Sequence, residues 1–316
     1  MSWNVENLFD TKHDTLKQDY EFLPDTLRRW TNTRYRKKLK DIATTIVSVG
    51  EMIPPSLVAL CEVENEKVMN DLTKYSPLKK MEYDYVMTNS KDLRGIDVAL
   101  LYQRAMFNLI ESRSIRIGKF DDYPPTRDVL HVSGRVLSGD TLDVFVCHLP
   151  SRRLGYKRSE RYRTHVAKTI KTYADSIMNI RQIPNIILMG DFNATLTDPC
   201  ICKALSATPT SKYTTDKDKT LFILQPKEYG SIKIGTYKYR GEWEFIDHII
   251  ISGRMLNDKN KVKYVKDSGR LSKLDFLLMP DEKYNGVQMN KTYVGFRYKG
   301  GISDHLPVCA DFVIHF

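Results

Sequence analysis

The chain has 316 residues, of which 41% are hydrophobic and 28% charged, a composition typical of globular proteins. No apolar run approaches the roughly 20 residues that cross a bilayer, which excludes a membrane-embedded protein. The 49 basic and 39 acidic side chains leave a net charge of +10, which fits a polyanionic partner and a merely solvated basic surface equally well.

The start of the chain is abrupt. Residues 1–5 are predicted to form a strand, without the basic, apolar and small-residue segments of a signal peptide. This start predicts a longer natural precursor with a leader, and it leaves secreted, periplasmic and cytoplasmic locations open. Five cysteines, an odd number spread thinly along the chain, indicate no disulfide framework.

Apolar periodicity predicts a mixture of strands and helices. In chain order we expect a helix over 31–49, strands over 57–64, 96–103, 129–137 and 141–149, a helix over 158–180, and strands over 185–192, 245–252 and 306–316. Most of these strands are almost continuously apolar and should be covered on both faces, whereas 129–136 alternates and predicts a half-covered antiparallel strand. A hairpin turn is expected at 138–140. The pattern predicts an α/β protein with mixed sheets.

No repeat, linker or composition break divides the chain, so we expect one domain over residues 1–316. Residues 253–299 are rich in Lys, Asp and Asn, and they predict a polar insertion before the last strand. The basic run of the first predicted helix is interpreted as a solvated face; it comprises Arg34, Arg36, Lys37, Lys38 and Lys40.

Carboxylates and amides recur where predicted strands end. They are Asn4, Glu6, Glu62, Asp191, Asn193, Asp247 and Asp304, the last of which is followed by His305. Any one of them could be a turn or a cap, but charged groups are costly in apolar strands unless they are paired or metal-bound. Their recurrence predicts one oxygen-rich cluster, the kind of site that binds Mg²⁺ or Mn²⁺.

Five short motifs that contain these residues resemble those of the endonuclease/exonuclease/phosphatase superfamily. In chain order they are Asn4 with Glu6, Leu60-Cys61-Glu62-Val63-Glu64-Asn65, Gly190-Asp191-Phe192-Asn193, Phe245-Ile246-Asp247-His248 and Ser303-Asp304-His305-Leu306-Pro307. The superfamily includes pancreatic-type deoxyribonucleases, apurinic endonucleases, neutral sphingomyelinases and inositol polyphosphate 5-phosphatases. Each motif alone is weak, but their order and separation over residues 2–308 are specific.

The resemblance implies a fold and a reaction. The fold is a four-layer α/β/β/α sandwich, in which two mixed sheets pack face to face beneath outer helices. The reaction is hydrolysis of a phosphate ester by an in-line water, with Mg²⁺ or Mn²⁺ as cofactor. Carried over by position, Glu62 is expected to be the main metal ligand, with Asn4 and Asp304 near it.

The resemblance also implies catalytic roles. Asp191 is expected to orient or deprotonate the attacking water, and Asn193 to hold a phosphate oxygen. His305 is expected to contact the scissile phosphate, while Asp247 fixes its tautomer and favours its charged form. These roles suit the chemistry, because attack on an anionic diester needs a cation and protonated donors to stabilise the added charge.

His148 distinguishes branches of the superfamily. The pancreatic-type nucleases and sphingomyelinases have histidine near this position, whereas the apurinic endonucleases usually have tyrosine. Asp97 is placed like the acidic partner of that histidine, so that an Asp97–His148 pair would mirror Asp247–His305 across the phosphate. Asp97 could equally be a cap at the start of its strand.

Four further residues are expected to bind substrate. Arg127 resembles an arginine that pancreatic-type nucleases place near a substrate phosphate. Arg152 and Arg153 closely follow the strand of His148, and a guanidinium suits bidentate phosphate contact, although a solvated basic turn is the alternative. Tyr237 lies in a stretch that interleaves rings and cations; it could stack a base, line a sugar pocket or merely reflect strand alternation.

Differences between this sequence and the motifs of individual branches indicate which branch of the superfamily it resembles. The residues around Asp247 lack the Trp-Cys-Asp-Arg pattern of the inositol phosphatases, no apolar loop resembles the membrane hairpin of the sphingomyelinases, and His148 weakens the apurinic branch. The motif set most resembles bacterial members. We therefore expect a metal-dependent phosphodiesterase, specifically a nuclease for DNA or RNA, that is monomeric and not inserted in a membrane. The alternatives are a phosphatase or phosphodiesterase of a small metabolite or lipid headgroup and, less favoured, a non-catalytic nucleic-acid-binding module.

Overall fold

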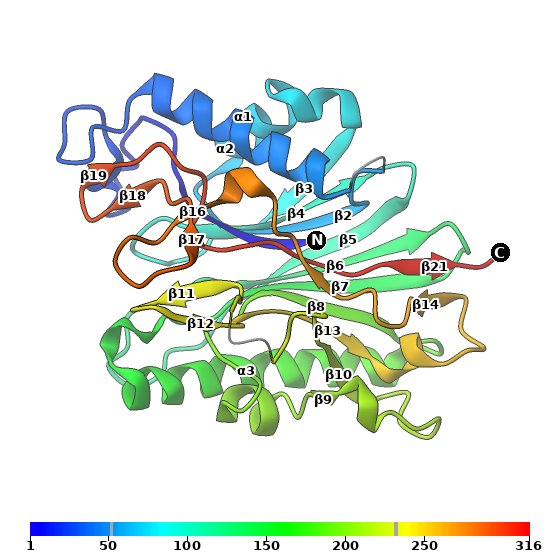
Figure 1. The fold of residues 1–316 in the computed structure, drawn as a ribbon. Helices are drawn as coiled ribbons and strands as arrows, with labels where there is room; N and C mark the ends of the chain where they lie inside the picture. Colours follow the sequence, from blue (N-terminus) through cyan, green and yellow to red (C-terminus); the bar gives the residue numbers. More distant parts are fainter. Residues whose placement is uncertain (51–52, 231–232) are drawn as a thin grey trace.

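The computed structural model describes residues 1–50, 53–230 and 233–316. Two large mixed β-sheets pack face to face (Figure 1). The helices α1 (Asn32–Val49) and α2 (Glu66–Lys74) cover the outer face of one sheet, and α3 (Tyr156–Ile180) covers the outer face of the other. The predicted four-layer sandwich is confirmed, while the single-domain organisation stays a prediction. Within the described residues, no helix is both long and apolar enough to cross a membrane.

The first sheet has six strands in the spatial order β15-β20-β1-β2-β4-β3. They are β1 (Ser2–Leu8), β2 (Leu57–Val63), β3 (Tyr83–Met87), β4 (Asp97–Gln103), β15 (Arg270–Leu271) and β20 (Val308–Cys309). β1 and β2 run parallel, so that their carboxyl ends lie at the same end of the sheet. The insertion at 253–299 contributes the edge strand β15, which pairs with β20.

The second sheet has seven strands in the order β5-β6-β7-β8-β13-β10-β9. They are β5 (Phe107–Ile115), β6 (Val129–Val136), β7 (Thr141–His148), β8 (Asn185–Asp191), β9 (Thr208–Pro209), β10 (Leu221–Leu224) and β13 (Asp247–Ser252). β6 and β7 form the predicted hairpin. β7 and β8 pair in parallel, which requires a crossover connection, and α3 provides it.

Burial on both faces explains why the predicted strands are almost continuously apolar. On β7, Val144 and Val146 belong to the core between the two sheets, whereas Phe145 and Cys147 belong to a second core beneath α3. The neighbouring strands β8 and β13 are divided between the two cores in the same way. These central strands are therefore held from both sides, which makes their ends a rigid platform.

The remaining elements are short. They are the strands β11 (Tyr237–Tyr239), β12 (Glu242–Glu244), β14 (Val262–Tyr264), β16 (Leu278–Pro280), β17 (Val287–Met289), β18 (Tyr293–Val294), β19 (Arg297–Tyr298) and β21 (Phe312–Ile314), the 3-10 turns η1 (Tyr20–Phe22), η2 (Pro77–Met81), η3 (Arg152–Leu154), η5 (Thr210–Lys212), η6 (Gly253–Leu256) and η7 (Asp275–Leu277), and the π-helical turn η4 (Cys200–Ala204). The hairpins β16–β17 and β18–β19 lie in the polar insertion. The strand predicted over 306–316 is split, because β20 pairs with β1 and β15 while β21 pairs with β14.

Strand β6 is not the half-covered strand that its alternation predicts. Its polar residues His131 and Ser133 are buried around Asp143 of β7, with His131 Nε2 at 3.0 Å from Asp143 Oδ1. Arg181, the residue after α3, covers this group and donates to both Asp143 oxygens, at 2.9 and 3.1 Å. Burial alone would raise the pKa of Asp143, but hydrogen bonds from His131, Arg181 and Ser133 outweigh it and lower that pKa to about 2.

We expect Asp143→Asn to lower the free energy of unfolding by about 2–3 kcal/mol at pH 7, because a buried carboxylate loses charge-assisted partners. A carboxyl whose pKa is lower in the folded state stabilises the fold above its unfolded pKa of about 4. That contribution is lost as the pH falls from about 4 towards 2. Urea unfolding should therefore show the same difference in the free energy of unfolding between variant and wild type at pH 7 and pH 5, and a smaller difference at pH 3. A gap that widens on acidification would contradict this assignment.

Candidate active site

Strand register brings three predicted site residues side by side. His148 at the end of β7 lies opposite Asp191 at the end of β8, and Asp191 lies opposite Asp247 at the start of β13. Residues that pair directly across neighbouring strands project from the same face of a sheet. The row His148–Asp191–Asp247 therefore forms one wall of a site at the end of the seven-stranded sheet.

The six-stranded sheet supplies the opposite wall through an irregular β1–β2 pair. Its register shifts between Asn4 and Leu8, and Glu62 has a left-handed backbone with φ of +66°. Such bulges turn side chains out of the regular alternation, and non-glycine residues with positive φ concentrate at functional sites. The turn brings the Asn7 amide to 2.9 Å from Glu62 Oε2, to which it donates.

His305 is the centre of the charge arrangement. Its Nδ1 lies 2.8 Å from Asp247 Oδ2, and its Nε2 lies 3.9 Å from Asp191 Oδ2. Burial alone would lower the pKa of His305, but the charges of Asp247 and Asp191 raise it well above its ordinary value. Burial and the nearby charge of Asp247 raise the pKa of Asp191 to about 7. The site thus holds a charged imidazole beside a carboxyl that titrates near neutral pH.

Asn4 and Glu62 join this centre across the sheets. Asn4 Nδ2 donates to Asp191 Oδ2 at 3.1 Å, and His148 Nε2 lies 3.6 Å from Asp191 Oδ2 and 4.0 Å from Glu62 Oε1. Burial alone would raise the pKa of Glu62, but Arg94, His305 and Arg127 together with the Asn7 amide lower it. Burial lowers the pKa of His148 well below its usual value. Glu62 is therefore ionised at neutral pH, while His148 is neutral.

The structure does not join Asp97 to His148. Asp97 instead accepts the Thr88 hydroxyl at 2.5 Å and the Ser90 amide at 3.0 Å, as a cap at the start of β4 does. Burial raises the pKa of Asp97 to about 6. Among the described residues, no hydrogen-bond partner reaches the buried Nδ1 of His148. Of the two interpretations of Asp97, the geometry favours the cap.

Asp304 lies at the open side of the site, with its side chain 29% exposed and Oδ1 at 3.9 Å from His305 Nε2. Glu6 lies deeper and accepts the backbone amides of Thr292 and Tyr293, at 2.8 and 3.3 Å. Burial and the charge of Asp304 raise the pKa of Glu6 to about 7. Glu6 therefore ties the polar insertion to the end of β1.

Lys38 is not part of a solvated face, and the sequence interpretation was wrong for this residue. It is 2% exposed, and its Nζ donates to the Glu6 carbonyl and to Thr292 Oγ1. Lys38 lies three residues after Tyr35 and four before Ile42, both buried, so it belongs to the inward stripe of α1. That spacing was the signal that could have shown a buried cation at the site.

The arginines predicted to bind substrate differ in position. Arg127 is buried; its Nη1 donates to Asp92 at 3.3 Å and its Nη2 to the Leu149 carbonyl at 2.8 Å. Arg152 donates to the Asn193 carbonyl at 3.1 Å and to Glu244 at 2.7 Å. Both guanidinium groups therefore brace the loops that follow His148 and Asp191. Arg153 is exposed.

Three other side chains complete the rim. Asn193 is held by its own contacts, because its amide donates to Asp191 Oδ1 at 2.8 Å and its Nδ2 to the Leu149 carbonyl at 3.1 Å. The ring of Tyr237 lies 4.9 Å from that of His305, centroid to centroid. Arg94 was missed by the sequence reasoning; its Nη1 lies 3.7 Å from Glu62 Oε1. No spacing signal distinguishes Arg94 from other loop cations.

A family model, that of the Endonuclease/Exonuclease/phosphatase family, matches residues 1–313 of the chain. The chain belongs to this family. Members of the endonuclease/exonuclease/phosphatase family are metal-dependent phosphoesterases. No curated protein sequence matches the chain significantly.

Solved structures of the endonuclease/exonuclease/phosphatase fold resemble the chain at low identity. Humanized TDP2 of D. rerio is 18% identical, with a TM-score of 0.57 over 98% of this chain and 96% of that one. The human nocturnin catalytic domain is 19% identical, with a TM-score of 0.54 over 98% and 93%. The mannosyl-6-phosphatase of Bacteroides thetaiotaomicron is 15% identical, with a TM-score of 0.56 over 99% and 98%. These similarities show the fold.

The donor atoms of the site fit the divalent cation that the endonuclease/exonuclease/phosphatase family requires. Asp191 and Asp247 each offer a carboxylate oxygen, and these two atoms and a ring nitrogen of the charged His305 lie within 4.8 Å of one another. Oδ1 of Asp247 is buried and has no hydrogen-bond partner in the part of the chain that the structure describes. Glu62 and Asp304 add carboxylate oxygens at the same end of the sandwich. Crowded oxygen donors of this kind suit a hard cation such as Mg²⁺ or Mn²⁺.

Proposed function

We propose that this chain is a divalent-metal-dependent phosphodiesterase, and specifically a nuclease that cleaves DNA or RNA by in-line attack of water. One observation carries the proposal. Asp191 lies in register between His148 and Asp247 and 3.9 Å from His305 Nε2, so a proton acceptor and two imidazoles share one buried centre. Phosphoester hydrolysis needs both kinds of group.

Each side chain has a proposed role. Asp191 accepts the proton of the attacking water, since a pKa of about 7 suits a general base at neutral pH. His305, charged and oriented by Asp247, stabilises the negative charge that develops on the phosphate. His148 contacts the other side of the phosphate, and Asn193 fixes the position of Asp191 through its backbone amide.

Glu62 is the proposed principal metal ligand, with Asn4 and Asp304 beside it. Its lowered pKa keeps the carboxylate charged at neutral pH, and its Oε1 faces His148. A bound Mg²⁺ or Mn²⁺ would supply positive charge against the phosphate and would make the attacking water more acidic. Tyr237 and the exposed Arg153 are proposed to contact substrate directly, whereas Arg127 and Arg152 act by bracing the site loops. The site residues come from one chain, so we expect a monomer.

A second candidate is a phosphatase or phosphodiesterase of a small molecule or lipid headgroup. It is favoured by the engagement of both Arg127 and Arg152 with protein acceptors, which leaves fewer cations at the site for a long polyanion. A purely binding function has less support, because the proposed catalytic groups apart from Asp97 converge.

The proposal is tested by metal removal with three substrates: plasmid DNA, RNA and bis-p-nitrophenyl phosphate. We expect EDTA to abolish hydrolysis and added Mg²⁺ or Mn²⁺ to restore it. Polynucleotide cleavage should fall steeply between 50 and 200 mM salt, because several phosphate contacts release counterions. Turnover of the small diester alone would favour the second candidate, and hydrolysis that persists in EDTA would contradict the metal-dependent mechanism.

A further inference from the structure

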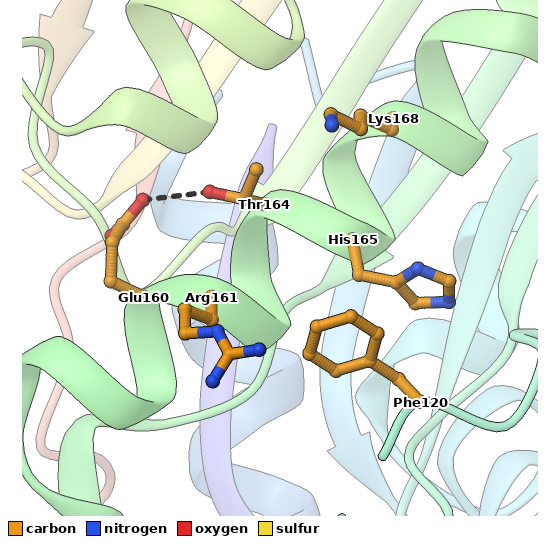
Figure 2. A pocket seen from close by; sticks show the side chains of 6 residues that line it. All are labelled: Phe120, Glu160, Arg161, Thr164, His165 and Lys168. Atoms are coloured by element: carbon orange, nitrogen blue, oxygen red, sulfur yellow. Dashed lines mark hydrogen bonds between the residues drawn. The ribbon is translucent and has the colours of Figure 1, made fainter.

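A pocket lies on the outer surface of α3, and its lining residues are distinct from those of the catalytic centre. It has a volume of about 280 Å³ and is lined by Phe120, Glu160, Arg161, Thr164, His165 and Lys168. Figure 2 shows the His165 side chain beside the ring of Phe120, which comes from a neighbouring loop, with Arg161 and Lys168 on the helix before and after His165. None of these residues takes part in the proposed chemistry.

One wall of the pocket is rigid and carries an unused polar atom. The ring of Phe120 stacks on that of His165, with centroids 4.6 Å apart and planes at 19°. Nε2 of His165 is buried, and no hydrogen-bond partner reaches it from the described residues. A buried ring nitrogen without a partner is costly, so its position against a pocket indicates a ligand or water that supplies the missing bond.

The acidic side chain at the pocket does not cancel its positive charge. Glu160 is turned inward, where it accepts the Thr164 hydroxyl at 3.0 Å, the Cys200 amide at 3.0 Å and Arg163 at 2.9 Å. The negative charge of Glu160 is balanced by the buried Arg163. Arg161 pairs with Asp121 at 3.0 Å, but both are well exposed, and such a surface pair is weak enough for another anion to replace it.

The pocket belongs to a row of cations that begins near the catalytic end. Arg158, Arg161 and Lys168 are exposed and, being three and seven residues apart, lie on one face of α3. The helix follows η3, and Arg163 contacts the carbonyl of Pro150 at 3.4 Å, two residues after His148. From Arg158 to Lys168 the helix rises about 15 Å. One strand of B-DNA places four or five phosphates along that length.

We propose that this pocket and the cation row of α3 bind backbone phosphates of a polynucleotide whose scissile phosphate lies in the catalytic centre. The inference rests on the proposed nuclease function. Phe120 already stacks on His165 and Tyr162, so the contacts available to the ligand are charges and one ring nitrogen. Binding at this second site is therefore independent of base sequence, and it increases affinity for long substrates.

The test is the double variant Arg161→Glu/Lys168→Glu, compared with Lys79→Glu/Lys80→Glu. The control residues are exposed on η2, which packs with α1 and α2 on the opposite outer layer, and the change in net charge is the same. Fluorescence anisotropy of a labelled 20-nucleotide DNA in EDTA measures binding without cleavage. Initial rates with plasmid DNA and bis-p-nitrophenyl phosphate measure catalysis.

For the α3 variant we expect roughly tenfold weaker DNA binding, a salt slope reduced by about 1.5 and unchanged turnover of the small diester. The control variant should stay within about twofold of wild type. Equal losses in both variants, or none in either, would overturn the second site, even in a protein that cleaves DNA. Wild type that binds DNA through α3 but cleaves only the small diester would overturn the nuclease function instead. Tighter binding of polyglutamate than of DNA would overturn the polynucleotide assignment.

Discussion

Replacing Asp191 with Asn is expected to lower kcat/KM by about 10³-fold for bis-p-nitrophenyl phosphate and for DNA. An amide has nearly the shape of the carboxylate and still accepts the Asn193 amide hydrogen bond of 2.8 Å, but it cannot take a proton from water. Loss of a general base typically costs 10²–10⁴-fold, and Asp191 also contributes negative charge beside the proposed metal site. Steady-state kinetics at saturating Mn²⁺ would measure the loss.

The same change should not destabilise the fold. Burial and Asp247 raise the pKa of Asp191 to about 7, so the ionised form is the unfavourable one in the folded protein. A carboxyl with a raised folded pKa stabilises below its unfolded pKa of about 4, and that contribution is lost as the pH rises to about 7. In EDTA at pH 8, Asp191→Asn should therefore unfold at the same or a higher temperature than wild type. Retention of more than a tenth of the activity would refute the assigned role.

Much of the fold could be predicted because the central strands obey local rules. The apolar runs that became β7, β8 and β13 are short, rich in β-branched residues and interrupted by polar turns, and burial on both faces makes them continuous. The burial of the polar face of β6 could not be predicted in this way. It depends on Arg181, which follows a helix and reaches Asp143 from 38 positions along the chain, and no local period records such a contact.

The site was predicted from the carboxylates at strand ends, because charged groups next to apolar strands are costly unless they are paired or bind a common metal ion. The hydrogen-bond partners of individual site residues were harder to predict. Asp97 and Thr88 pair across a turn between β3 and β4, and only the folded geometry separates that cap from a contact with His148. Lys38 was interpreted as solvent-exposed because its neighbours in the sequence are basic, although its helical spacing places it on the buried face of α1. Its burial depends on the Glu6 carbonyl, which becomes available because β1 departs from regular pairing.

Asp247→Asn should lower kcat/KM about as much as Asp191→Asn does, but it should also change the pH dependence of the reaction. The Asp247 carboxylate lies 2.8 Å from His305 Nδ1. Removing a carboxylate behind a catalytic imidazole costs about 10⁴-fold when the wrong tautomer results. We therefore expect kcat/KM to fall by 10³–10⁴-fold even at saturating Mn²⁺, so that weaker metal binding does not account for the loss.

The pH profile of Asp247→Asn is the sharper test. The Asp247 charge raises the pKa of both His305 and Asp191, so its removal should lower both pKa values. The two limbs of the kcat/KM profile between pH 5 and 10 should therefore move together towards acid. Asp143→Asn is the matched control, since it removes a buried Asp–His contact of 3.0 Å in the same sheet. That control should lose stability and keep its profile. An unshifted profile for Asp247→Asn would show that Asp247 serves the fold and not the imidazole.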